Sequence, residues 1–210
     1  HLLSRRQRQM CIRDRYIITI TKQYASLGGR IGKRVAEKLG IPVYNRESLE
    51  QEAAELDASL LPLIQNEEQM NNYYKMAYPL GIGSSIKQNR MFELQRDLIL
   101  KHAKSERCVI IGRCADYILR EYENTLKCYI FAPYPARVKN TICLLGRTTA
   151  EPQRIIEEVD KARAAYYRSH TDCEVNNTRY RDAFFNSAAL GIEGTADMIV
   201  DMAKRKFHLA

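Results

Sequence analysis

Residues 16–44 read YIITITKQYASLGGRIGKRVAEKLGIPVY, and this stretch decides the fold. Tyr16–Thr21 is a short β-branched run, typical of a strand that is buried on both faces. A polar turn with two adjacent glycines follows, and Ile31–Leu39 then places apolar residues at helical spacing until Gly40. Ile41–Tyr44 reads as a second brief strand. A strand, a glycine turn, a helix and a strand form a βαβ unit, which implies a parallel sheet.

The rest of the chain continues this alternation. We expect further strands at 108–112, 126–132 and 183–186, and helices at 46–56, about 91–103, 115–122, 136–145, from Pro152 onward, and 195–204. Residues 57–88 carry no motif that we can interpret. The sequence therefore predicts a three-layer α/β/α fold around a five-stranded parallel sheet.

Composition excludes several classes of protein. With 45% hydrophobic and 28% charged residues the chain is ordinary and globular. It has no apolar run long enough to span a bilayer and no secretion-signal pattern at its start, so we expect a cytoplasmic protein without a membrane partner. The six cysteines (11, 108, 114, 128, 143 and 173) form no C-x-x-C pair, which favours buried reduced thiols over disulfides or zinc. Four separated histidines suggest no metal centre, and His102 reads as an ordinary helix residue.

The net charge of +8 is unevenly distributed. Residues 1–15, HLLSRRQRQMCIRDR, hold five arginines and one aspartate, and they resemble translated sequencing-adapter read-through. We expect them to be an extraneous or disordered segment, and residues 16–210 to form one domain. The modest positive charge that remains fits an anionic small molecule better than a nucleic acid.

The glycine turn between strand and helix is the first candidate site. Such a turn presents backbone N–H groups and a helix N-terminus to an anion. It does not match G-x-x-x-x-G-K-[ST], however, and many α/β proteins use glycines there only for close packing. Phosphate binding and simple packing both stay open from these residues alone.

Four segments together resemble the cytidylate kinase-like family. They are ITITKQYASLGGRIGK at 18–33, LGIPVYNRE at 39–47, VIIGRCADYIL at 109–119 and DKARAAYY at 160–167, in the expected order and spacing. The resemblance implies a P-loop kinase fold and transfer of the ATP γ-phosphoryl group to a nucleoside monophosphate, CMP or dCMP. It further implies ATP and Mg²⁺ as cofactors and small-molecule nucleotides as partners, and leaves the oligomeric state open.

The phosphate loop implied by the resemblance comprises eight residues: Ser26, Leu27, Gly28, Gly29, Arg30, Ile31, Gly32 and Lys33. Family members usually carry more glycine where this chain has Ala25 and Leu27. Either Gly29-Arg30 or Gly32-Lys33 can stand in the Gly-Lys position. We favour the first register, because the second places the lysine well inside the helix. Ser26 is then the nearest hydroxyl for a metal shell.

Further roles follow from the resemblance and from position. The candidates for acceptor binding are Asn45, Arg46, Arg113 and Asp116, and the candidates for catalysis are Arg30, Asp160 and Arg163. A lid at about 137–170 would contribute Arg137, Lys161, Arg163 and Tyr167. For any one of these arginines, a solvated surface charge is the alternative interpretation. Asp116 could equally be only a helix-start residue.

Two other functions compete with a monophosphate kinase. The same fold could phosphorylate a different small acceptor. Alternatively, the altered loop could belong to a nucleotide-binding regulatory protein with weak or no catalysis.

Overall fold

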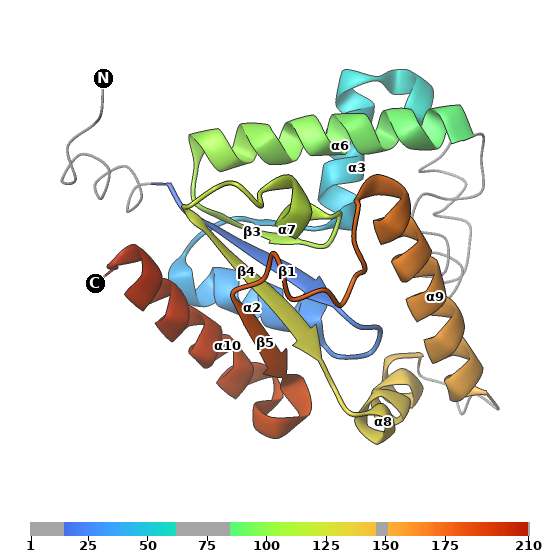
Figure 1. Cartoon of the computed structure of the whole chain (residues 1–210), viewed down its shortest axis with the longest axis vertical. Coiled ribbons are helices and arrows are strands. Elements are labelled where there is room, and N and C mark those ends of the chain that lie inside the picture. Colours follow the sequence, from blue (N-terminus) through green and yellow to red (C-terminus); the bar gives the residue numbers. More distant parts are fainter. Residues whose placement is uncertain (1–14, 62–84, 146–150, 210) are drawn as a thin grey trace.

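The computed structural model describes residues 15–61, 85–145 and 151–209. Within them, strands and helices alternate along the chain (Figure 1). The strands are β1 (Ile17–Lys22), β2 (Val43–Tyr44), β3 (Cys108–Ile111), β4 (Thr125–Phe131) and β5 (Ala183–Asn186). The helices are α2 (Gly28–Leu39), α3 (Arg46–Leu56), η1 (Ala58–Leu60, a 3₁₀ turn), α6 (Ser85–Ser105), α7 (Ala115–Ile118), α8 (Tyr134–Leu145), α9 (Pro152–His170) and α10 (Ser187–Phe207).

The five strands form one parallel sheet in the order β2-β3-β1-β4-β5. The central strand β1 pairs on both sides, with Ile17 opposite Cys108 of β3 and Thr125 of β4. The predicted α/β class and the five-stranded parallel sheet are confirmed. The long βαβ connections are what a parallel sheet requires, because successive strands must run in the same direction.

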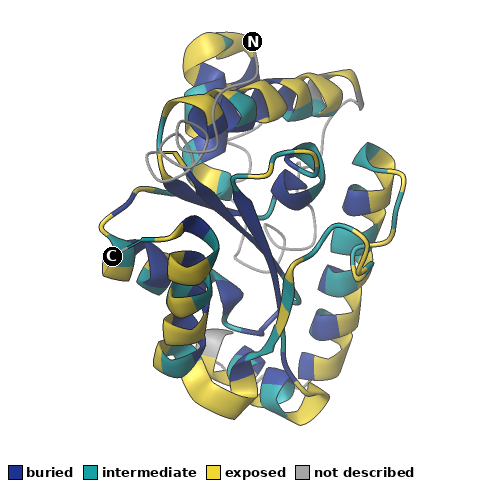
Figure 2. Cartoon of the chain, turned by 60° about the vertical axis from the view of Figure 1, so that its left-hand side comes forward, coloured by how far each residue is buried: buried dark blue, intermediate teal, exposed yellow. Residues whose placement is uncertain are grey.

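Each face of the sheet is covered by its own set of helices. Ile18 and Ile20 lie in a buried cluster with residues of α2 and α10, whereas Ile17 lies in a second cluster with residues of α3, α6 and α7. This division follows from the strand period of two, which sends successive side chains to opposite faces. Figure 2 shows the sheet buried at the centre and the helices exposing their outer sides.

Two helix boundaries differ from the sequence-based expectation in ways that matter for the site. Helix α2 begins at Gly28, three residues earlier than the apolar periodicity indicated, because Gly28 and Gly29 carry no side chain that could contribute to that pattern. Helix α10 begins at Ser187 rather than 195 and is kinked at Gly191, whose φ of 66° interrupts the periodicity there.

Helices α8 and α9 lie at the edge of the sheet toward which the strands point (Figure 1). They contain the described part of the predicted lid, while Arg147 and residues 146–150 fall outside the described ranges. The predicted N-terminal segment falls outside them as well, except for Arg15. The expectation of buried thiols is confirmed at Cys108, Cys114 and Cys128, whereas Cys143 is exposed and Cys173 is half-buried. No helix in the described parts of the chain is long and apolar enough to cross a membrane.

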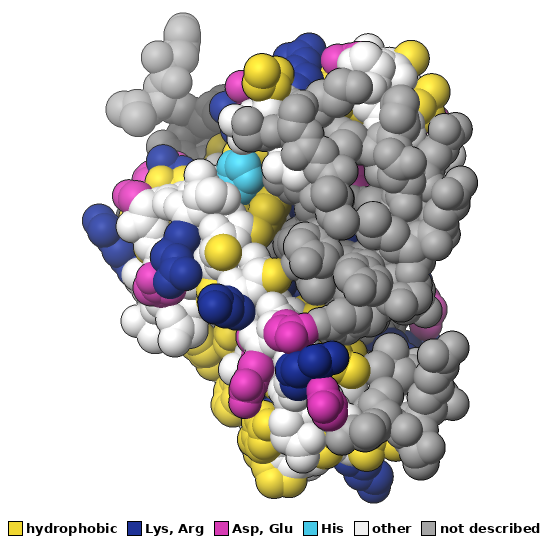
Figure 3. Space-filling model, turned by 90° about the vertical axis from the view of Figure 1, so that its right-hand side faces the viewer, with side chains coloured by type: hydrophobic (Ala, Val, Ile, Leu, Met, Phe, Trp, Pro, Cys, Tyr) yellow, Lys and Arg dark blue, Asp and Glu magenta, His cyan; other side chains and the backbone are white. Residues whose placement is uncertain are grey.

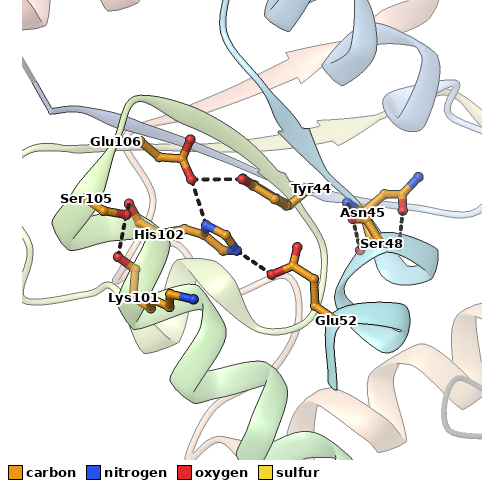
Figure 4. Close-up of polar contacts among 8 residues, drawn as sticks. All are labelled: Tyr44, Asn45, Ser48, Glu52, Lys101, His102, Ser105 and Glu106. Carbon is orange, nitrogen blue, oxygen red and sulfur yellow. Dashed lines mark hydrogen bonds and ion pairs between the residues drawn. The ribbon is translucent and has the colours of Figure 1, made fainter. Parts of the chain in front are cut away.

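A partly buried polar cluster joins the edge strand β2 to α3 and α6 (Figure 4). His102, 8% exposed, lies between two carboxylates, with Nδ1 2.7 Å from Glu106 and Nε2 2.9 Å from Glu52. Tyr44 stacks on the imidazole at 3.9 Å between ring centroids and donates its hydroxyl hydrogen to Glu106. His102 is therefore more than an ordinary helix residue, because its ring joins three elements.

Candidate phosphate-binding site

A cleft of about 450 Å³ opens at the carboxyl ends of β1 and β3, beside the N-terminus of α2. The connection after β1 leads to β2 on one side of the sheet, and the connection after β3 leads to β4 on the other side. The strand order therefore reverses between β1 and β3, and open α/β sheets bind ligands at such points. The basic residues that line the cleft are Lys22, Arg30, Lys33, Arg46, Arg113 and Arg163. Among the described residues that line it, Glu47 is the only carboxylate. The excess of positive charge suits an anionic ligand.

Among the described residues, no side chain caps the N-terminus of α2. Leu27 occupies the N-cap position with φ 61°, and its side chain can accept no hydrogen bond from the first turn. The next helix is different, because Asn45 caps α3 by accepting a hydrogen bond from the Ser48 N–H in a reciprocal capping box. The backbone donors at the start of α2 thus lack the partner that a capping side chain provides. Combined with the surrounding cations, they fit a phosphate group.

The loop before α2 has the backbone shape of a glycine-rich turn without its glycines. Ala25 and Leu27 both adopt left-handed conformations, with φ values of 57° and 61°. Such a conformation costs an L-residue roughly 1–2 kcal/mol, which glycine avoids. Family members usually carry more glycine where this chain has Ala25 and Leu27, and these are the two positions whose backbone conformation favours glycine.

Three of the predicted phosphate-binding residues are engaged elsewhere. Ser26 is fully buried, and its hydroxyl donates to the Gln23 carbonyl at 2.9 Å, so it does not face the cleft as a metal ligand. The Ile31 side chain is in the core, and its N–H donates to the Leu27 carbonyl. A Cβ on Gly32 would lie 2.7 Å from Cδ1 of Ile111, so this glycine lets α2 approach β3 closely. Their placement gives no support to a direct phosphate contact.

Arg113 is held by a carboxylate that sequence reasoning missed. It pairs with Glu50, which also accepts a hydrogen bond from Arg46 Nε at 2.9 Å. Arg113 and Glu50 are 6% exposed each, and both arginines line the cleft. Arg46 and Glu50 are four residues apart on a helix, and this spacing could have predicted their ion pair from the sequence. Glu50 orients two arginines of the predicted acceptor site.

Helix α9 is fastened to the phosphate loop by Asp160. One carboxylate oxygen accepts the Tyr24 N–H at 2.9 Å, and the other pairs with Arg137. Arg137 also donates to the Tyr24 carbonyl at 2.8 Å. Asp160 and Arg137 do not line the cleft, so their geometry favours a positioning role over direct catalysis.

Among the described arginines of the predicted lid, Arg163 is the one that lines the cleft. Its guanidinium lies 5.7 Å from the centroid of the Tyr24 ring, and its buried Nη1 has no hydrogen-bond partner among the described residues. Burial lowers the pKa of this guanidinium, an effect that nearby Asp160 opposes. A buried donor without a partner, facing a basic cleft, is consistent with a ligand that completes the site.

Asp116 does not reach the cleft. Its carboxylate is fully buried, and it accepts hydrogen bonds from Arg181 Nη2 at 2.7 Å and from the Tyr167 hydroxyl at 3.2 Å. Burial raises the pKa of Tyr167, which keeps its hydroxyl protonated as a donor. Asp116 thus ties α7 and α9 to the segment before β5, whereas Tyr167 also lines the cleft.

The outer side of α9 carries paired charges rather than a phosphate clamp. Lys161 is exposed, Arg154 pairs with Glu151 and Glu158, and Arg168 pairs with Glu174. Figure 3 shows basic and acidic side chains interspersed on this face. A continuous basic surface of the kind that binds nucleic acid is absent from the described residues of this face.

Of the predicted site residues, the cleft brings together eight: Gly29, Arg30, Lys33, Asn45, Arg46, Arg113, Arg163 and Tyr167. It adds Thr21, Lys22, Glu47 and Tyr166, to which we had assigned no role. Among the described residues, no group of three His, Cys, Asp or Glu side chains could hold a metal ion.

The cytidylate kinase-like family model matches residues 17–189. A search of curated proteins found no match. Among solved structures, an uncharacterized protein from Eubacterium ventriosum ATCC 27560 has a TM-score of 0.70 at 21% identity, covering 90% of this chain and 98% of that one.

Two kinase structures share the fold. A shikimate kinase from Bacteroides thetaiotaomicron has a TM-score of 0.52 at 16% identity, covering 90% of this chain and 98% of the other. A gluconokinase from Sinorhizobium meliloti 1021 has a TM-score of 0.51 at 11% identity, covering 92% and 91%. Identities this low establish similarity of fold, and the predicted P-loop kinase architecture is confirmed at that level.

Proposed function

This chain belongs to the cytidylate kinase-like family, and we propose that it transfers the γ-phosphoryl group of ATP to a nucleoside monophosphate, CMP or dCMP. The observation that carries the proposal is the cleft itself, in which six basic side chains surround the uncapped N-terminus of α2. Phosphoryl transfer depends mainly on holding phosphates in line and balancing their charge. ATP with Mg²⁺ supplies the transferable group.

The cleft residues divide by the element from which they come. The backbone N–H groups at the start of α2, with Gly29 lining the cleft, face the donor phosphates. Arg46 and Arg113, held by Glu50, bind the acceptor phosphate as planar forks. Arg163 of α9 contacts the transferring group from the lid side.

Asp160 and Arg137 hold α9 against the phosphate loop, and so they set the position of Arg163. This coupling supports a lid that excludes water when a nucleotide is bound. Asn45 caps α3 and lines the cleft, which supports its assignment to acceptor binding.

A coupled assay of ADP release over CMP, dCMP, UMP and AMP tests the proposal. We expect turnover with CMP or dCMP and a decrease in kcat of about 10³-fold in Arg163→Met, because a phosphoryl-clamping arginine contributes that much or more. Arg154→Met is the matched control on the same helix, since Arg154 makes only exposed ion pairs. Absence of turnover with all four acceptors would eliminate this function for them.

A second candidate is phosphorylation of another small acceptor. The observation that favours it is that structures with this fold include a shikimate kinase and a gluconokinase, so the fold accommodates acceptors that are not nucleotides. Turnover with a panel of small hydroxylated acids and sugars, combined with none on nucleotides, would select it. ATP binding in calorimetry without turnover on any acceptor would instead select the regulatory alternative.

A further inference from the structure

This loop has no lysine at the position where a standard phosphate loop carries one, but the side chain of another lysine lies over that position. In G-x-x-x-x-G-K-[ST] the motif runs from the end of a strand to the start of a helix. Strand β1 ends at Lys22 and α2 begins at Gly28. Counted from Lys22, the motif puts its second glycine at Leu27, which has the left-handed φ of 61°, and its lysine at Gly28.

The Lys22 side chain passes directly over Gly28. A Cβ on Gly28 would lie 2.7 Å from Cβ and 3.1 Å from Cδ of Lys22, and a Cβ on Gly29 would lie 3.8 Å from its Cε. The aliphatic stem therefore occupies the space that a side chain at Gly28 would need. Its end lies beside the first turn of α2, and Lys22 and Gly29 both line the cleft.

The charge of Lys22 has no partner among the described residues. No hydrogen bond or ion pair joins its ammonium to any of them, and the charged groups that face it are Arg163, Glu47 and Arg113. An ammonium on a half-buried side chain next to two guanidinium groups is unfavourable until an anion joins them. Burial and these arginines, against the opposing effect of Glu47, lower the pKa of Lys22 to about 7.

We propose that Lys22 is the cation that contacts the donor phosphates in this loop, taking the place of the absent motif lysine. The proposal rests on the proposed function, because it takes the ligand to be a nucleotide polyphosphate. It assigns this contact to neither of the residues that the sequence suggested. Arg30 and Lys33 are exposed, and Lys33 stands five residues into α2, about 7 Å along the helix from its first residue.

Anion binding at Lys22 is coupled to proton uptake. With a pKa near 7, most Lys22 side chains are neutral at pH 8, and a bound phosphate raises that pKa. Binding at pH 8 is then accompanied by proton uptake. Affinity is highest below pH 7 and falls by up to about tenfold per pH unit above it, until the pKa of the complex is reached.

Titration calorimetry with a non-hydrolysable ATP analogue and Mg²⁺, at pH 8 in two buffers of different ionisation enthalpy, tests the proposal. We expect the unmodified chain to take up a large fraction of a proton. Lys22→Met should lose this uptake and roughly 10- to 100-fold in affinity, as expected for a lost charged hydrogen bond. Lys101→Met, an exposed lysine on α6, is the control and should match the unmodified chain.

Lys22→Arg keeps the test valid if Lys22→Met fails to fold. Arginine stays charged at pH 8, so this variant should bind the analogue without proton uptake. Proton uptake that persists in Lys22→Arg, or affinity within twofold of the unmodified chain in Lys22→Met, would overturn the role of Lys22 and leave the proposed function standing. No binding by the unmodified chain would remove both.

Discussion

Replacing Asp116 by Asn separates a binding role for this residue from a structural one. The sequence placed Asp116 in the acceptor site, yet its side chain is fully buried and pairs with Arg181, whose side chain is 2% exposed. Asn keeps the shape and can still accept one hydrogen bond, but it removes the negative charge. The buried guanidinium of Arg181 is then left without its counter-ion.

The magnitude follows from that burial. Removing one partner of a buried ion pair costs about 3–5 kcal/mol, since the remaining charge is uncompensated. A domain of this size loses roughly 2–4 °C in its unfolding midpoint per kcal/mol. We therefore expect Asp116→Asn to lower the midpoint by roughly 6–20 °C.

Thermal unfolding followed by circular dichroism measures this change. Asp201→Asn is the control, because Asp201 makes only an exposed pair with Arg205 on α10, and its midpoint should stay within about 2 °C. Removing both charges, in Asp116→Asn combined with Arg181→Met, should recover part of the loss. An unchanged midpoint in Asp116→Asn together with abolished nucleotide binding would refute the structural role and return Asp116 to the acceptor site.

Two further predictions concern the lid and the edge strand. Arg137→Met removes the contacts to Asp160 and to the loop, so it should raise KM for ATP several-fold; a KM within 1.5-fold of the unmodified chain in steady-state kinetics would argue against this fastening. His102→Leu leaves two carboxylates without the imidazole between them and should lower the free energy of unfolding by about 1–3 kcal/mol in urea titrations. A loss below about 0.5 kcal/mol would mean that the cluster contributes little to stability.

Much of the fold could be predicted from local pattern. Strand and helix periodicities located every strand, and Arg46–Leu56 was expected with the bounds that α3 has. Errors occurred where the pattern is silent, as at Gly28, or interrupted, as at Gly191. Glycine has no side chain to join a periodic face, so the start of α2 could not be read from its spacing.

The candidate site was predicted only in part. Motif position identified residues that line the cleft, such as Arg46 and Arg113, because βα junctions of a parallel sheet meet at one edge. Motif position could not distinguish the charged residues that line the cleft from those that hold the surrounding helices in place. Asp160 and Asp116 are each within three residues of a cleft residue in the sequence, yet neither lines the cleft.

The sequence by itself therefore determined the family, the order of strands and helices, and the loop at which we propose an anion site. Only the tertiary structure determined which residues the charged side chains contact. Arg113 meets Glu50 across 63 residues, and Tyr24 meets Asp160 across 136. Periodicity reports only on neighbours within a few residues, whereas these pairs depend on which strands lie side by side. The exposure of Lys22, and with it the affinity of its ammonium for a proton, is set by the same long-range packing.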